Sequence, residues 1–303
     1  MRRSFVLLLS YLCMLQRIPV HSQYYYYNDK YYNTDWVIEF GGSAGIMNSL
    51  TDIGGRKGIG KKFFRDLNWK MTKPGFALYA MGMYKDVLGV RLEGTFGTIG
   101  SYDSILKKVG PSTFGRYERN LSFRSNITDV HLGVEVHPLF FKNYEEGEAP
   151  LFSPYIAAGV GLFTFNPQAY LNGKWNYLHP LRTEGQGFGE YPDRKPYKLT
   201  QLNLPLGIGV RYELGYFLSA RLEFLYRILF TDYIDDASHV DYIDSSLFGD
   251  YLAASQAALA RQLFDRRLST VKNNQRGDPK DNDAFLTIQL KVGITLRSAR
   301  ARR

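Results

Sequence analysis

The stretch "NITDVHLGVEVH" (residues 126–137) decides the fold, because its side chains alternate between apolar and polar. Val130 and Leu132 stand on one side of an extended chain, whereas Asp129 and Glu135 stand on the other. A period of two residues is typical of a β-strand with two different faces. A membrane barrel turns its apolar face to lipid and encloses the charged one.

Seven further segments of ten residues or more repeat this alternation. Ten residues is the length that a tilted strand needs to cross a membrane. Together with residues 126–137 these segments make eight predicted strands. The other seven are residues 36–45, 74–84, 87–100, 154–165, 199–214, 216–230 and 284–297.

The connections between these segments alternate strictly between short and long. The short ones are residues 85–86, the turn at Gly215, and the moderate connection 138–153; the long ones are 46–73, 101–125, 166–198 and 231–283. Transmembrane barrels have short periplasmic turns and long outer loops, and an even strand number leaves both termini in the periplasm. The sequence therefore predicts an all-β protein, an eight-stranded antiparallel transmembrane β-barrel with long extracellular loops.

The N-terminus is typical of an exported protein. A basic start precedes the apolar run "SFVLLLSYLCML" (residues 4–15), and cleavage is expected after "VHS", before Gln23. We therefore predict a signal peptide over residues 1–22 and an outer-membrane barrel domain over 23–303. The single cysteine, Cys13, lies in the predicted signal peptide, so the mature chain would have no disulfide and no thiolate metal site.

Charge and composition argue against nucleic-acid binding and favour a membrane barrel. The chain has a net charge of +9, and loss of residues 1–22 would lower it to +6 because three arginines and no acid lie there. No basic stripe interleaved with aromatics indicates nucleic-acid binding. The 23 tyrosines, 20 phenylalanines and 29 glycines instead favour a β-barrel of the outer membrane.

Charged residues on the inward faces of the predicted strands form the main candidate site. An eight-stranded barrel is only wide enough for its own side chains to fill it. Opposite charges in that space must pair, because an unpaired buried charge costs several kcal/mol. We predict a structural ion-pair network in the lumen, without catalysis, cofactor or metal. Its members are Glu39, Arg91, Glu93, Asp129, His131, Glu135, Arg211, Arg221, Glu223 and Lys291.

The first long loop carries a near match to a phosphate-binding loop. "GRKGIGK" (residues 55–61) has the required glycine and lysine spacing, but Lys62 stands where the motif needs a hydroxyl for Mg²⁺. The loop is also expected outside the cell. We therefore predict no nucleotide binding, and interpret the segment as a flexible glycine hinge bearing cations.

The last long loop contains two other notable segments. "TDYIDDASHVDYID" (residues 231–244) gathers five aspartates, but their spacing does not match a Ca²⁺ loop. We expect a solvated loop there, with an incidental cation site as the alternative. Apolar residues then recur at helical spacing over residues 247–267. They predict an amphipathic helix that packs on the outer rim of the barrel, with docking to a partner as the alternative.

The moderate connection 138–153 offers a candidate partner surface at the periplasmic end. Its segment "FFKNYEEGEAP" places aromatics beside acids, which is the composition of an interface core with a charged rim. An aromatic belt at the membrane interface is the alternative interpretation. The predicted contacts are Phe140, Phe141, Tyr144, Glu145 and Glu146.

Four stretches resemble the DUF6089 family of Bacteroidetes outer-membrane proteins, which includes PorG-like components of the type IX secretion system. They are residues 119–138, 152–187, 194–212 and 227–238, whereas residues 41–66 and 239–282 depart from the family pattern. The resemblance implies an eight-stranded barrel that holds a periplasmic ring or lipoprotein complex to the outer membrane. We therefore expect a non-catalytic anchor or assembly subunit in contact with outer-membrane lipid. A small porin or a surface-binding barrel is the alternative.

Overall fold

The fold is dominated by eight long antiparallel strands. The computed structural model describes residues 36–55, 67–107, 113–142, 150–215, 217–269 and 275–297. The predicted signal peptide and most of the cation-bearing hinge lie outside these ranges. The long strands are β1 (Trp36–Leu50), β2 (Lys73–Tyr84), β3 (Leu88–Tyr102), β4 (Ser122–Val136), β5 (Phe152–Thr164), β8 (Thr200–Glu213), β9 (Leu218–Leu229) and β10 (Ala284–Arg297).

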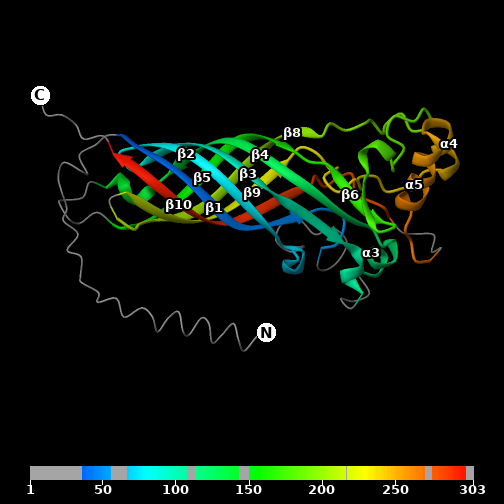
Figure 1. Cartoon of the computed structure of the whole chain (residues 1–303), viewed down its shortest axis with the longest axis horizontal. Helices are drawn as coiled ribbons and strands as arrows, with labels where there is room; N and C mark the ends of the chain where they lie inside the picture. The colour runs from blue at the N-terminus through cyan, green and yellow to red at the C-terminus, as the bar shows by residue number, and fades with distance from the viewer. Residues whose placement is uncertain are drawn as a thin grey trace, which may run out of the picture.

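These strands close on themselves. Each long strand pairs antiparallel with the next, and β1 pairs with β10 over a register that includes Phe40 opposite Ile294. Closure leaves no sheet edge with unpaired backbone groups, as a barrel in hydrocarbon requires. The predicted eight-stranded antiparallel barrel is therefore confirmed (Figure 1).

The two ends of the barrel differ as the loop lengths predicted. At one end β2 turns into β3 through Lys85 and Asp86, whose φ angles of 51° and 55° fit the tight turn that matches strand twist. Val37 pairs with Arg297, so β1 begins at this end and β10 ends there. We call it the short-turn end. The four long connections emerge at the opposite, long-loop end (Figure 1).

The strands extend beyond the predicted segments on the long-loop side. β1 continues to Leu50 and β4 begins at Ser122. A short hairpin, β6 (Pro167–Leu171) and β7 (Lys174–Tyr177), pairs with the end of β4, and the prediction did not include it. Its turn is Asn172-Gly173, with φ angles of 52° and 79°. Because Asn-Gly between short extended runs is a strong hairpin signal, the sequence did contain the information.

Short helices lie in the connections. They are the 3₁₀ helices η2 (Trp69–Met71), η3 (Asp103–Leu106), η5 (Pro138–Phe141), η6 (His179–Leu181) and η7 (Ser245–Leu247), and the α-helices α3 (Phe114–Arg119), α4 (Phe248–Tyr251) and α5 (Ala254–Phe264). No helix in the described ranges is long and apolar enough to span a membrane.

The predicted helix over residues 247–267 is two helices, and its packing differs from the expectation. The chain leaves the helical conformation at Leu252 and Ala253, between α4 and α5. Leu263 does not lie on the barrel rim but packs in a separate cluster with Leu181 and Phe188. The third long connection forms the β6–β7 hairpin and a loop, and their apolar side chains pack against α5. This cluster lies at the far end of the molecule from the short turns of the barrel (Figure 1).

We call the described parts of the four long connections, with β6 and β7, the cap. The cap has two apolar clusters. The outer one surrounds α5, and the inner one lies at the mouth of the barrel, where Ile234 of the last loop meets Phe163 of β5. The cap therefore has a core of its own and is packed onto the barrel.

Candidate functional site

The barrel has an inverted distribution of polarity. On β2 the outward Leu78 is 68% exposed, whereas on β3 the inward Glu93 is fully buried. A soluble protein does not leave such a continuous apolar wall exposed, and a barrel in lipid needs one. The residues that carry chemistry are therefore enclosed in the lumen.

All ten residues of the predicted lumen network are buried inside the barrel. Four predicted cations and four predicted carboxylates form one connected group in the short-turn half, and Arg211 extends it to Asp86 at 3.1 Å and to Glu213 at 3.2 Å. The cations are Arg91, Arg211, Arg221 and Lys291, and the carboxylates are Glu39, Glu93, Glu135 and Glu223. The remaining two, Asp129 and His131, lie further toward the cap.

Arg91 is the centre of this group. Its guanidinium lies 3.1 Å from Glu93 and 2.7 Å from Glu223, and it also donates to Glu135. Arg221 bridges Glu135 at 2.7 Å to Glu39 at 2.9 Å. Arg91 therefore contacts three carboxylates, and each of them also contacts a second cation, either Arg221 or Lys291.

Two tyrosines that the prediction missed complete the network. The Tyr79 hydroxyl donates to Glu39 at 2.6 Å, and that of Tyr155 donates to Glu223 at 2.9 Å. The guanidinium carbon of Arg221 lies 5.5 Å from the centre of the Tyr155 ring. Tyrosine is compatible with either face of a strand, so only its position in the alternation indicated the lumen.

A second pair lies nearer the cap. The guanidinium of Arg227 donates to Asp129 at 2.8 Å, and the Asn203 amide donates to the same carboxylate at 2.6 Å. The His131 ring nitrogen Nδ1 lies 3.2 Å from Asp129. Arg227 was not predicted, although it continues the inward positions of Arg221 and Glu223 on β9.

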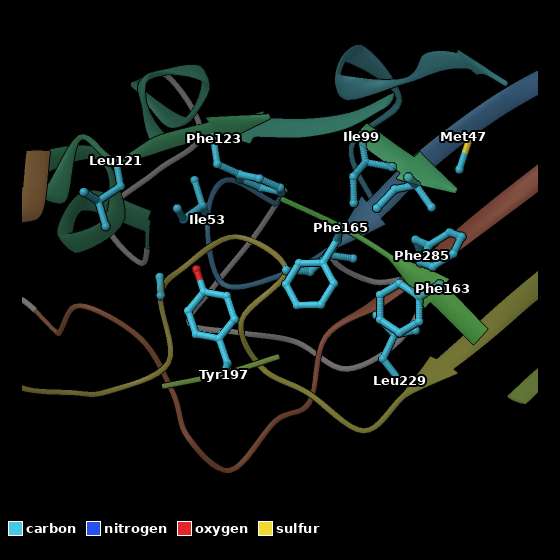
Figure 2. Packing of buried hydrophobic residues seen from close by; sticks show 13 residues of the cluster. Met47, Ile53, Ile99, Leu121, Phe123, Phe163, Phe165, Tyr197, Leu229 and Phe285 are labelled. Atoms are coloured by element: carbon cyan, nitrogen blue, oxygen red, sulfur yellow. The ribbon is translucent and has the colours of Figure 1, made fainter. Parts of the chain in front are cut away.

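Aromatic and aliphatic side chains fill the lumen beyond Arg227. Phe163 and Phe285 face one another with ring centres 6.0 Å apart, and Phe165 stacks on Phe163 at 5.4 Å (Figure 2). Arg227 lies over the Phe285 ring at 5.0 Å, so the charged and apolar layers are in contact. Tyr197 of the cap stacks on Phe165 at 5.9 Å and covers this layer.

The space left inside the barrel is small. A cavity of about 10 Å³ lies beside His131, Glu135 and Ala157. That volume holds about one water molecule. A larger hollow of about 560 Å³ lies on the outer wall among Ile156, Ile208 and Leu222, which face away from the lumen. Along the described strands, paired charges and aromatic side chains occupy the lumen.

The acidic segment 231–244 is not the solvated loop that we expected. Asp235 is buried and accepts hydrogen bonds from the backbone amides of Ile53 and Ala237, both at 3.0 Å. The hydroxyl of Tyr197 donates to Asp236 at 2.7 Å. Asp232, Asp235 and Asp236 are buried, whereas Asp241 and Asp244 are exposed.

Burial changes the acidity of these cap carboxyl groups. It raises the pKa of Asp235 to about 7 and that of Asp236 to about 6. Burial, together with the nearby carboxylates of Asp52 and Asp235, raises the pKa of Asp232 to about 10. Among the described residues, no three His, Cys, Asp or Glu side chains are grouped so as to hold a metal ion. The carboxyl group of Asp232 therefore stays protonated at neutral pH.

The predicted partner surface is only partly described. Phe140 and Phe141 lie in η5 at the short-turn end, and Phe141 is 67% exposed. Tyr144, Glu145 and Glu146 lie outside the described residues. The structure thus places an exposed aromatic at the end that we assigned to the periplasm from loop lengths.

Together these features define an eight-stranded transmembrane β-barrel with a filled lumen. No family model and no curated protein matches the chain. Among solved structures it is similar to Neisserial surface protein A, at 9% identity and a TM-score of 0.36 over 86% of this chain and 95% of that one. OprG from Pseudomonas aeruginosa is similar at 11% identity and a TM-score of 0.36, over 88% and 98%. Ail of Yersinia pestis has 11% identity and a TM-score of 0.35, over 87% and 99%.

Proposed function

We propose that this chain is a non-catalytic outer-membrane barrel that serves as an anchor or assembly subunit of a protein secretion machine. One observation carries the proposal: the lumen is filled from the Glu39–Arg221 pair to the Phe163–Phe285 layer. Such a barrel does not act through its interior, so its function belongs to the surfaces at its two ends. The resemblance to PorG-like members of the DUF6089 family supports the type IX system as the machine.

The orientation follows from loop length. With the short turns in the periplasm and the cap outside, both termini are periplasmic, as expected for an even number of strands and a cleaved signal peptide. The exposed apolar wall supports contact with outer-membrane lipid. No step of this function requires a nucleotide or a cofactor.

The contact with a periplasmic ring or lipoprotein complex falls on the connection between β4 and β5. The other two short-turn connections, residues 85–87 and 214–217, are too small to bury much surface. The 137–151 connection is larger and presents Phe141. Exposed aromatics form the core of many interfaces, and the acids beside them orient the partner.

We expect substitution of Phe140, Phe141 and Tyr144 by serine to abolish co-purification of the periplasmic partner from crosslinked outer membranes. The barrel itself should still migrate faster in gels before boiling than after, because none of the three belongs to a barrel strand or to the lumen network. Phe114→Ser, an exposed aromatic on the cap, is the matched control and should leave the complex intact. Survival of the complex in the triple variant would show that this anchor surface is wrong.

The porin alternative makes the opposite prediction for conductance. We expect the purified barrel to give no steady ion current in planar bilayers, because paired charges and an aromatic layer fill the lumen. Insertion must be verified by protease protection of the strands. Reproducible ohmic steps from the unmutated protein would favour the porin.

A further inference from the structure

The hairpin of β6 and β7 presents an exposed aromatic face with cations around it. Tyr170 is 48% exposed, Trp175 38% and Tyr177 52%, although each is a large ring on a well-paired strand. The rings of Tyr170 and Trp175 lie 5.3 Å apart, edge to face. We call these three rings, with Arg124, the hairpin face.

The strand register shows that the hairpin face is one surface. Tyr170 pairs with Trp175, and Gln168, two residues before Tyr170, pairs with Tyr177, so all four side chains lie on the same side of the hairpin. Gln168 also pairs with Arg124 of β4. Arg124 shares its strand face with the lipid-facing Val130 and Leu132, so the hairpin face continues the outer wall of the barrel.

The charge of this face is entirely positive among the described residues. The guanidinium carbon of Arg124 lies 4.1 Å from the centre of the Trp175 ring, and its Nε donates to Gln168 at 3.0 Å. Arg266 adjoins the hairpin by donating to Ser122 at 3.1 Å and to the Tyr170 carbonyl at 3.5 Å. Residues 164–183 contain no Asp or Glu, and none of these cations has an acidic partner in the described structure. The site is thus complementary to an anion.

The height of the face distinguishes it from a membrane-interface belt. The outward side chains change from apolar to polar between Val130 and Thr128, and Thr128 pairs with Thr164 of β5 at the same level. Arg124 is four residues further, which is about 13 Å along the strand and about 9 Å in height at a tilt near 45°. Lipid headgroups occupy only about 5–8 Å on each side of the hydrocarbon. The aromatic rings therefore lie just above the level of phospholipid headgroups, where the saccharides of a glycolipid would be.

We propose that the hairpin face binds the phosphorylated saccharide headgroup of a glycolipid in the outer leaflet. The C–H groups of a sugar ring are weakly positive and pack on the negative faces of aromatic rings. Arginine matches phosphate oxygens with paired donors, and Arg124 lies beside the Trp175 ring. The inference rests on the proposed outward orientation of the cap, but not on a role in secretion.

Native mass spectrometry of the full barrel in nonionic detergent tests this proposal. The probe is lipid A that carries its inner-core sugars and both phosphates, with the dephosphorylated glycolipid and phosphatidylglycerol as comparison ligands. We expect one phosphorylated glycolipid to bind at least tenfold more tightly than either comparison. Trp175→Ala/Tyr177→Ala should weaken binding at least tenfold, and Arg124→Gln should weaken binding of the phosphorylated form selectively.

The matched control is Trp69→Ala, which removes an exposed tryptophan from η2, away from the hairpin. It should bind as the unmutated protein does, and every variant should retain heat-modifiable migration. Equal binding of phosphatidylglycerol would overturn the saccharide specificity, and unchanged binding in the double variant would overturn the site. Loss of the secretion partner leaves this result unaffected, so the two proposals fail separately.

Discussion

Arg91→Ala is expected to lower the free energy of unfolding of the barrel by about 3–5 kcal/mol, the cost of leaving a buried ion pair without one partner. The change removes the shared donor of Glu93, Glu135 and Glu223. Arg211, Arg221 and Lys291 remain, but Glu39, Glu93, Glu135 and Glu223 would then share three cations inside a wall of hydrocarbon. Urea unfolding in lipid vesicles, followed by heat-modifiable migration, measures the loss.

Two further variants distinguish lost pairing from lost volume. Leu92→Ala removes an outward side chain from the neighbouring position of β3 and should cost much less, because that side chain is 53% exposed. Adding Glu223→Gln to Arg91→Ala should recover stability, since the neutral amide no longer needs a cation. If Arg91→Ala unfolds at the same urea concentration as the unmutated barrel, the network does not stabilise the fold.

The barrel could be predicted from the sequence because its rules are local. Each side chain on β4 alternates between lipid and lumen, so Asp129, His131 and Glu135 are assigned inward by counting residues alone. The same counting would have assigned Arg227, which lies four residues beyond Glu223. Pairing partners were not predictable in this way: Glu39 and Arg221 are 182 residues apart and meet only after the barrel closes.

The cap could not be predicted because its contacts are long-range and irregular. Asp235 meets the amide of Ile53 across 182 residues, and no periodic pattern indicates that meeting. A run of aspartates in a loop usually indicates exposure to solvent. That expectation is wrong for residues 231–244, because Asp232, Asp235 and Asp236 are buried. The spacing of apolar residues over 247–267 predicts a helix. The surface that α5 covers could not be predicted, because it belongs to the β6–β7 hairpin and the loop after it.

The buried cap carboxyl groups should make the cap less stable as pH rises. Asp232 is buried, and the effect of Ser238 beside its carboxyl group is smaller than that of burial. Its pKa is raised from 3.8 to about 10, mainly by burial and then by Asp52 and Asp235. The folded cap therefore keeps a proton that the unfolded cap releases above about pH 4. The stabilising contribution is complete below that pH and is lost progressively as pH rises toward 10.

Asp232→Asn should remove this dependence, because an amide is neutral at every pH. At pH 8 we expect amide hydrogen exchange in residues 231–240 and 276–285 to be at least about tenfold slower in the variant, which corresponds to about 1.4 kcal/mol. At pH 4 the two proteins should exchange alike after correction for intrinsic rates, since the acid is then protonated in both states. Asp250→Asn, an exposed aspartate on α4, is the matched control and should change neither value. Faster exchange in the Asp232 variant at pH 8 would mean that the ionised carboxylate is stabilised by a cation bound among the cap aspartates, and the proton-storage account would be wrong.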